Sequence, residues 1–135
     1  MPLLSWKAEY SVNIKEVDDQ HKKLIEMINE LNDAMGQGKA KDVLGAILGR
    51  LVSYAASHFA MEERLLQAHG YEEYQDHKEK HEKMTAKVLE LQRQFKDGKA
   101  AMTIEVMNFL KNWLDKHILG TDMKYSAFLN SKGVK

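Results

Sequence analysis

Apolar residues recur at a helical spacing through nearly the whole chain, and this periodicity constrains the fold more than any other feature. The breaks between periodic stretches coincide with glycines, at Gly36, Gly38, Gly70, Gly98 and Gly120. The only proline is the second residue, so no interior helix needs to be kinked or ended by one. No stretch shows the two-residue alternation that is typical of strands. The sequence therefore predicts an all-α protein.

Four long helices are expected, over residues 18–35, 41–67, 72–96 and 100–118, followed by a short C-terminal helix over 122–129. Asp18 or Asp19 is expected to cap the first of them. Residues 1–16 are expected to form an irregular N-terminal arm. Because the connections are short, consecutive helices must run antiparallel. This gives an up-down-up-down four-helix bundle in a single domain, residues 1–135. Each helix should turn one apolar stripe to the core. The apolar stripe of the fourth helix includes Val106, Phe109 and Trp113.

Composition and charge exclude several classes of protein. The chain has 20 lysines and arginines against 20 aspartates and glutamates, so it lacks the basic excess of a nucleic-acid binder. No uninterrupted apolar run approaches the roughly 18–20 residues that span a bilayer, and the N-terminus is not typical of a secretory leader. We therefore expect a cytoplasmic protein without membrane insertion, and a monomer, since no extra apolar stripe calls for a partner. Without cysteine, any metal must be bound by nitrogen and oxygen.

Five of the six histidines fall on these core stripes, where a buried helix ordinarily carries apolar side chains. Three of these histidines belong to pairs at positions i and i+4, which lie on one face of a helix. The pairs are His58 with Glu62, and His77 with His81.

The remaining two members are His21, near the start of the first helix, and His117, at the end of the fourth. In an up-down-up-down bundle all these positions lie at the same end, in one layer of the core. Five uncompensated imidazoles and a carboxylate would be costly to bury, and coordination of a metal removes that cost. The pattern therefore predicts a buried metal site.

Each of these residues has a simpler interpretation when taken alone. A single histidine on an apolar stripe is more often a hydrogen-bonded core residue, and pairs at this spacing also arise by chance. The complete set, with a member on every long helix, favours a metal site. His69, beside Gly70, is expected at the surface and is excluded. Asp122 is a further ligand if Gly120 breaks the helix and turns the chain back toward the core; otherwise it only caps the last helix.

With Asp122 included, the order and spacing of these residues resemble hemerythrin, in particular the single-domain bacterial hemerythrins. The resemblance covers nearly the whole chain, including VDDQHKKL at 17–24 and WLDKHILGTDMKY at 113–125. It implies a cofactor of two iron ions per chain (Fe2+/Fe3+) that share an oxo or hydroxo bridge. The implied ligands are, for one iron, His77, His81 and His117; for the other, His21 and His58; and, bridging the two, Glu62 and Asp122.

The resemblance also implies a function. The implied ligands leave one coordination position open, on the iron held by His21 and His58, where dioxygen can bind. Neutral imidazole ligands make high-valent iron less accessible than carboxylate-rich di-iron sites do, which favours reversible binding over cleavage of oxygen. We therefore expect oxygen storage, transport or delivery, with an oxygen-consuming enzyme as a candidate recipient. The alternatives are a di-iron oxidase or peroxidase, an enzyme that handles nitric oxide or nitrite, and an oxygen- or iron-sensing module.

A dry pocket should cover the open position. The resemblance and the helical spacing assign its lining to five core residues, only some of which need contact oxygen: Leu24, Phe59, Trp113, Leu114 and Ile118. Tyr125, three residues beyond Asp122, is expected to hydrogen-bond a bridging carboxylate.

Overall fold

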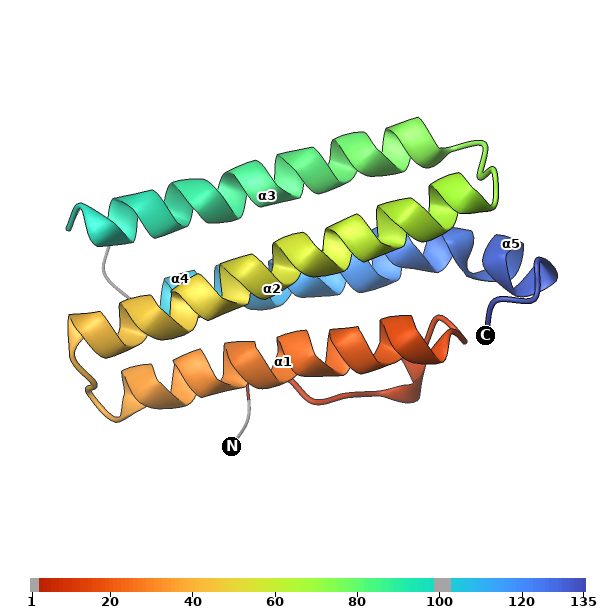
Figure 1. The fold of residues 1–135 in the computed structure, drawn as a ribbon. Helices are drawn as coiled ribbons and strands as arrows, with labels where there is room; N and C mark the ends of the chain where they lie inside the picture. The colour runs from red at the N-terminus through yellow and green to blue at the C-terminus, as the bar shows by residue number, and fades with distance from the viewer. Residues whose placement is uncertain (1–2, 99–102) are drawn as a thin grey trace.

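The computed structural model describes residues 3–98 and 103–135, and these form a bundle of antiparallel helices (Figure 1). The four long helices are α1 (Lys15–Gly36), α2 (Lys41–Ala68), α3 (Tyr74–Lys96) and α4 (Ile104–Asp115). The described ranges contain no strand. The predicted all-α bundle is confirmed.

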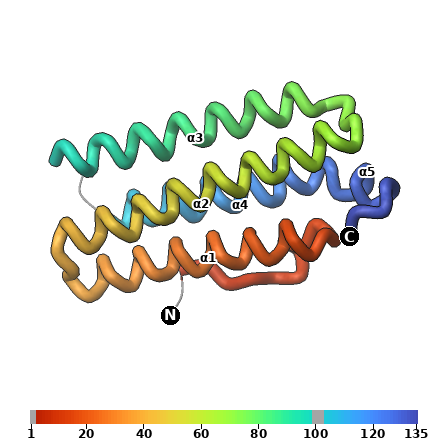
Figure 2. Tube along the Cα trace, viewed as in Figure 1, coloured from red at the N-terminus to blue at the C-terminus, as the bar shows by residue number. Residues whose placement is uncertain are grey.

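Short elements extend the bundle at one end. A 3₁₀ turn, η1 (Ala8–Tyr10), lies in the N-terminal arm. After α4 the chain continues into a π-helical turn, η2 (Lys116–Thr121), a 3₁₀ turn, η3 (Asp122–Tyr125), and a last short helix, α5 (Ser126–Ser131). The tube in Figure 2 shows α5 beside the end of the bundle where α1 begins, α2 ends and α3 begins. That is the end where the sequence predicts the metal site.

Two apolar clusters make up the core. The larger runs along the bundle and includes Leu24, Leu51 and Leu114. The smaller joins the arm, the end of α2 and α5, through Val12 and Leu129 among others. The polar residues described below lie where these two clusters approach each other. The second cluster therefore closes the end of the bundle over them.

The first helix starts earlier than expected, and its predicted cap is wrong. It begins at Lys15, after Ile14, whose side chain makes no capping bond. Asp18 instead lies inside the first turn, where its carboxylate accepts hydrogen bonds from the backbone N–H of Val12 (2.9 Å) and from Ser11 Oγ (2.6 Å). Asp18 thus ties the arm to α1, a local side chain-to-backbone bond of the kind that aspartate favours near helix starts.

Two further boundaries need comment. The third helix begins at Tyr74 rather than at residue 72, because its N–H first bonds to the carbonyl of Tyr71 in a tight turn. The predicted start of the fourth helix, residue 100, lies outside the described residues. The helix is described from Ile104, after Thr103, whose hydroxyl accepts from the N–H of Val106 (3.2 Å).

The stripe predicted for the fourth helix is partly wrong. Trp113 is buried and Val106 is half-buried, but Phe109 is 38% exposed. Met107, which the prediction leaves out, is buried instead. The face of α4 that meets the core is therefore rotated relative to the predicted stripe.

The length and composition of α2 are those of a helix that could cross a membrane, with a mean hydropathy of 1.3 over its most apolar window. In the bundle α2 packs between α1 and α3, and its apolar residues belong to the core cluster. It also buries a histidine and a glutamate, His58 and Glu62. Its apolar character is accounted for by this packing.

Candidate metal centre

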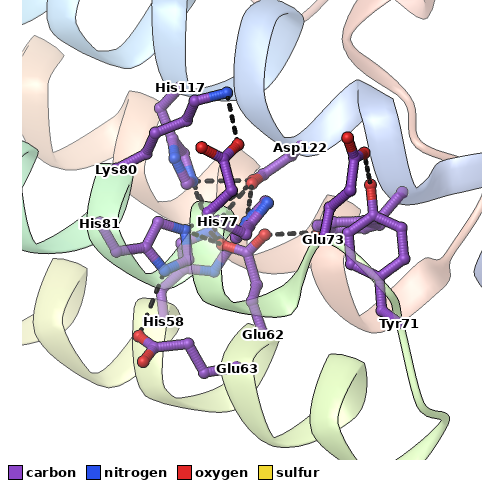
Figure 3. A network of polar contacts seen from close by, with 12 residues as sticks. His58, Glu62, Glu63, Tyr71, Glu73, His77, Lys80, His81, His117 and Asp122 are labelled. Carbon is purple, nitrogen blue, oxygen red and sulfur yellow. Dashed lines mark hydrogen bonds and ion pairs between the residues drawn. The ribbon is translucent and has the colours of Figure 1, made fainter.

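The structure gathers all seven candidate ligands into one buried cluster at the closed end of the bundle. Figure 3 labels all of them except His21. No member is more than 3% exposed. Five elements contribute to this histidine–carboxylate cluster, which consists of His21 from α1, His58 and Glu62 from α2, His77 and His81 from α3, His117 from η2 and Asp122 from η3. His69, which follows the last residue of α2, is not part of it.

A π-helical turn brings Asp122 into the cluster. In a regular α-helix, side chains five residues apart point about 140° away from each other. Over Lys116–Thr121 the hydrogen bonding widens to i→i+5, and the longer turn returns Asp122 to the face of His117. The Asp122 Oδ2 atom lies 2.7 Å from His117 Nε2. Asp122 is therefore a buried member of the site as well as the first residue of η3.

The prediction that Gly120 breaks the helix is wrong in its mechanism. The backbone of Gly120 is not among those with positive φ. A Cβ atom added there would meet only the side chain of Lys116, at an ordinary distance of 4.0 Å. The widened turn, rather than the conformational freedom of glycine, redirects the chain.

One half of the cluster is compact. His21 Nε2 lies 3.0 Å from His58 Nε2, which in turn lies 3.0 Å from His117 Nε2. Asp122 Oδ2 lies 2.8 Å from His21 Nε2, and Glu62 Oε1 lies 2.5 Å from His58 Nε2. Two nitrogens bound at right angles about 2.1 Å from a transition metal would stand about 3.0 Å apart. The spacing of these atoms therefore fits coordination of a shared ion.

The other half of the cluster is more open. His77 Nε2 lies 3.3 Å from Asp122 Oδ1, and His81 Nε2 lies 3.9 Å from Glu62 Oε1. Both carboxylates thus face both halves, as bridging ligands would. In this structure His117 is grouped with His21 and His58, not with the α3 histidines as the resemblance implies. Its Nε2 contacts oxygens of both carboxylates, which hold it over the compact half.

Several buried polar atoms of the cluster lack hydrogen-bond partners among the described residues. Some lie within ion-pair distance of one another, but the angles are not those of hydrogen bonds. The unpartnered atoms are His21 Nδ1, Glu62 Oε1, His77 Nε2, His81 Nε2, His117 Nδ1 and Asp122 Oδ1. Each unsatisfied buried group costs about 1–3 kcal/mol. A metal ion would accept the inward-facing lone pairs, and a donor set of imidazole and carboxylate suits iron.

Burial keeps most of the imidazoles neutral. It lowers the pKa of His77 to about 4 and that of His81 to about 3. Burial, with the neighbouring His58 and His117, also holds the pKa of His21 well below its usual value. A neutral imidazole offers a lone pair, so these residues are in the state that binds metal.

The two carboxylates are pushed in opposite directions. Burial and the charge of Glu62 raise the pKa of Asp122 well above its usual value. Burial also tends to raise the pKa of Glu62, but His58 and His117 outweigh it and hold that pKa low. Two like charges this close cannot both be stable without a compensating cation.

Hydrogen bonds from outside orient the cluster. Tyr125 Oη donates to Glu62 Oε2 at 2.5 Å, the bond expected from the sequence. His58 Nδ1 donates to Gln20 Oε1 (2.7 Å), and His81 Nδ1 donates to Glu63 Oε2 (3.2 Å). Because these oxygens only accept, each Nδ1 must carry the proton, which leaves Nε2 facing inward with its lone pair.

Sequence reasoning missed both outer partners, Gln20 and Glu63. Each binds a histidine of a neighbouring helix, so no spacing within one helix reveals it. The available signal was their position directly beside candidate ligands, at His21 and Glu62.

All five residues predicted to line an oxygen pocket are buried, and their contact with oxygen stays a prediction. The ring of Phe59 stacks on His81, with 4.2 Å between centroids. The indole of Trp113 lies nearly parallel to the His117 ring, with centroids 6.5 Å apart, and its Nε1 donates to the carbonyl of Met84 (3.2 Å). The wall on this side of the cluster is therefore apolar and aromatic.

Comparison with known proteins decides the family. Residues 12–129 match the family model of the hemerythrin HHE cation binding domain. The chain belongs to the hemerythrin family. It is 33% identical over 132 residues to the bacteriohemerythrin of Methylococcus capsulatus. This alignment covers 97% of this chain and 100% of that protein. It is 37% identical over 125 residues to the bacteriohemerythrin of Pseudomonas aeruginosa, covering 93% of this chain and 80% of that protein.

Solved hemerythrin structures share the fold. A crystal structure of a wild-type hemerythrin superposes with a TM-score of 0.88 at 34% identity, covering 94% of this chain and 98% of that one. The resemblance to hemerythrin inferred from the sequence is confirmed.

Proposed function

We propose that this chain binds dioxygen reversibly at a non-haem di-iron centre, and that it stores, transports or delivers oxygen instead of acting as an enzyme. The observation that carries the proposal is the histidine–carboxylate cluster, whose buried ligand atoms converge on a common space. Among the described residues, the Nε2 atoms of His77 and His81 and one oxygen of each carboxylate have no hydrogen-bond partner there. In this proposal the irons are held as the resemblance implies, by His77, His81 and His117, by His21 and His58, and by the bridging carboxylates Glu62 and Asp122. The bound irons would supply the electrons that oxygen accepts on binding and returns on release.

The protein surroundings support a carrier. Apart from the cluster, the buried polar side chains of the described residues are Thr121 and Ser126, with the hydroxyls of Tyr10 and Tyr125 and the indole N–H of Trp113. The Tyr10 hydroxyl donates to Asp115, and the Trp113 indole donates to the carbonyl of Met84. Ser126 Oγ donates to the carbonyl of Val12 (2.6 Å), and Tyr125 donates to Glu62. None of them is a spare acid that could protonate oxygen and drive its cleavage.

The apolar wall would keep the site dry. Leu24, Leu114 and Ile118 are at most 1% exposed, and Phe59 covers His81. Exclusion of water and anions protects reduced irons from irreversible oxidation. The names of the bacteriohemerythrin relatives also favour this function. A monomer that passes oxygen to an oxygen-consuming enzyme is the simplest form of the proposal.

The test is an oxygen titration of the purified protein. Metal analysis should first give two irons per chain. After anaerobic reduction, oxygen should produce a visible charge-transfer band that disappears when the solution is purged with argon, with as much oxygen released as was bound. His69→Ala, which removes the one histidine outside the cluster, is the matched control and should behave like the parent. A single zinc per chain, or oxidation without release of oxygen, would contradict the proposal.

A further inference from the structure

A groove of about 430 Å³ lies between α3 and the segment formed by α4 and η2. Its floor is apolar and aromatic, made by Met84, Phe109 and Trp113. Phe109 is 38% exposed, an unusual position for a large aromatic side chain that was expected in the core. The groove lies on the solvent side of the aromatic wall, outside the histidine–carboxylate cluster.

Lysines surround this apolar floor. Lys80, Lys83 and Lys87 follow one face of α3 along the groove, and Lys116 stands on the opposite side. Among the described residues, no acidic side chain lines the groove. Of the four lysines, Lys80 has an ion-pair partner in the described part of the chain, Asp76 at 3.1 Å.

No described carboxylate lies within 4.0 Å of the other three ammonium groups, those of Lys83, Lys87 and Lys116. The chain as a whole has zero net charge. The concentration of positive charge is therefore local, and a concave site lined by one sign of charge attracts ligands of the other sign.

We propose that this groove binds a planar aromatic anion, a ring system that carries a phosphate or carboxylate group. Its volume lies in the range of small-molecule sites, roughly 300–1,000 Å³. The floor offers aromatic surface for a ring, and lysine ammonium groups bind phosphate as point charges. From Lys80 to Lys87 the rim runs for about 10 Å along the helix. That length suits a system of two or three fused rings and is short for an amphipathic peptide helix.

The groove is separated from the cluster by single side chains. Trp113, on its floor, lies at 18° to the plane of the His117 ring on the other side. Thr121, which also lines the groove, directly precedes Asp122. An occupant would therefore lie against Trp113, and its binding can be read there without reference to oxygen or iron. The proposal thus stands or falls independently of the proposed function.

Trp113 can serve as the reporter. The chain has two tryptophans, so the Trp6→Phe variant leaves Trp113 as the only one. Flavin mononucleotide and riboflavin are matched probes, because they share the ring system and differ by the phosphate. Flavin mononucleotide should quench the Trp113 fluorescence saturably. Riboflavin, which lacks the phosphate, should bind at least about tenfold more weakly. Calorimetry of the same titrations checks that the quenching reports binding. Added salt should weaken the binding of the phosphate form.

Two double variants test the lysines. Lys83→Gln with Lys87→Gln should lower the affinity for flavin mononucleotide about tenfold and reduce its salt dependence. The matched control, Lys78→Gln with Lys96→Gln, removes the same charge from the same helix but outside the groove and should bind like the parent. Circular dichroism checks that both variants fold. Equal binding of the two flavins, equal losses in the two variants, or binding of a poly-glutamate peptide but of neither flavin would overturn the proposal.

Discussion

The two halves of the histidine–carboxylate cluster hold their imidazoles in different ways. On the compact half, His58 has a neutral outer partner, the amide oxygen of Gln20. Its inward nitrogen lies against Glu62. On the open half, His81 has a charged outer partner, the carboxylate of Glu63, and its inward nitrogen has no hydrogen-bond partner.

The pKa of His58 is shifted in the opposite direction from those of the α3 histidines. Burial lowers the pKa of His58, but Glu62 and Asp122 outweigh it and hold that pKa above its usual value. For His77 and His81 burial prevails, and their pKa values fall to about 4 and about 3. His58 thus offsets the cost of its burial through the carboxylates, whereas at His21 burial prevails and holds the pKa well below its usual value. The open half leaves its nitrogens unpaired and depends more on a bound ion.

The largest expected effect is that of removing the metal. Ligand binding stabilises the folded state by about 4 kcal/mol when the free ligand is at 1,000 times its dissociation constant. Treatment with a chelator should therefore lower the free energy of unfolding by about that amount, measured by urea titration at pH 7. Restoring ferrous iron under anaerobic conditions should reverse the loss. Equal urea midpoints with and without metal would mean that the unpaired nitrogens of α3 need no ion.

The second effect tests one ligand of the open half. His77→Ala removes an inward nitrogen for which the cluster offers no substitute, so iron affinity should fall about 100-fold or more, or roughly 3 kcal/mol. Iron content after dialysis against a weak chelator is the measurement. His69→Ala, the control, should keep its iron. If His77→Ala retains the iron content of the parent, His77 is not a ligand.

The third effect concerns pH in the metal-free protein. Because the folded-state pKa values of His77 and His81 lie below the unfolded value near 6.5, the unfolded chain binds protons that the folded chain does not. The stability that these neutral imidazoles contribute is complete above about pH 6.5 and is lost as the pH falls toward 4 for His77 and toward 3 for His81. Each loses up to about 1.4 kcal/mol per pH unit, so one histidine alone loses roughly 2–3 kcal/mol by about pH 4.5. His21 acts in the same direction, and the opposite shifts of His58 and Asp122 offset part of the sum.

Urea titrations of the metal-free protein at pH 7 and pH 4.5 measure this loss. His77→Ala, also without metal, should show a shallower decline because one of the titrating groups is gone. If the metal-free parent is equally stable at pH 7 and at pH 4.5, the imidazoles of α3 are not buried as neutral groups.

The features that could be predicted from sequence are those that depend on local geometry. Helical spacing along one element places His77 and His81 on one face, and short connections fix which helix ends meet. Those two facts were enough to bring His21 and His117 into the same layer from opposite ends of the chain.

The features that were missed depend on contacts between elements. Met107, not Phe109, meets the core because packing against the other helices sets the rotation of α4. Asp18 bonds to the arm instead of capping α1 because residues of the arm are themselves buried. The π turn before Asp122 likewise has no clear signal in the residues that form it, and it places Asp122 against His21 of another helix.

The smallest expected effect tests the outer partners, where the two halves differ most directly. Glu63→Gln keeps an acceptor for His81 Nδ1 but removes its charge. A carboxylate partner raises the basicity of an imidazole ligand, so the neutral amide should weaken iron binding about tenfold. Gln20→Glu is the reciprocal change at His58, and it should strengthen binding. Glu82→Gln, an exposed residue next to His81, controls for the loss of one negative charge.

Competition with a chelator at fixed pH measures these affinities, and urea titration of each metal-free variant separates them from changes in folding. The expected changes in iron affinity have opposite signs in Glu63→Gln and Gln20→Glu, and this distinguishes the two explanations. If affinity falls in Glu63→Gln and rises in Gln20→Glu, while Glu82→Gln stays unchanged, the charge of the outer partner sets how strongly each half binds its ion. If Glu82→Gln lowers the affinity as much as Glu63→Gln does, only the overall charge matters, and the two halves differ in geometry alone.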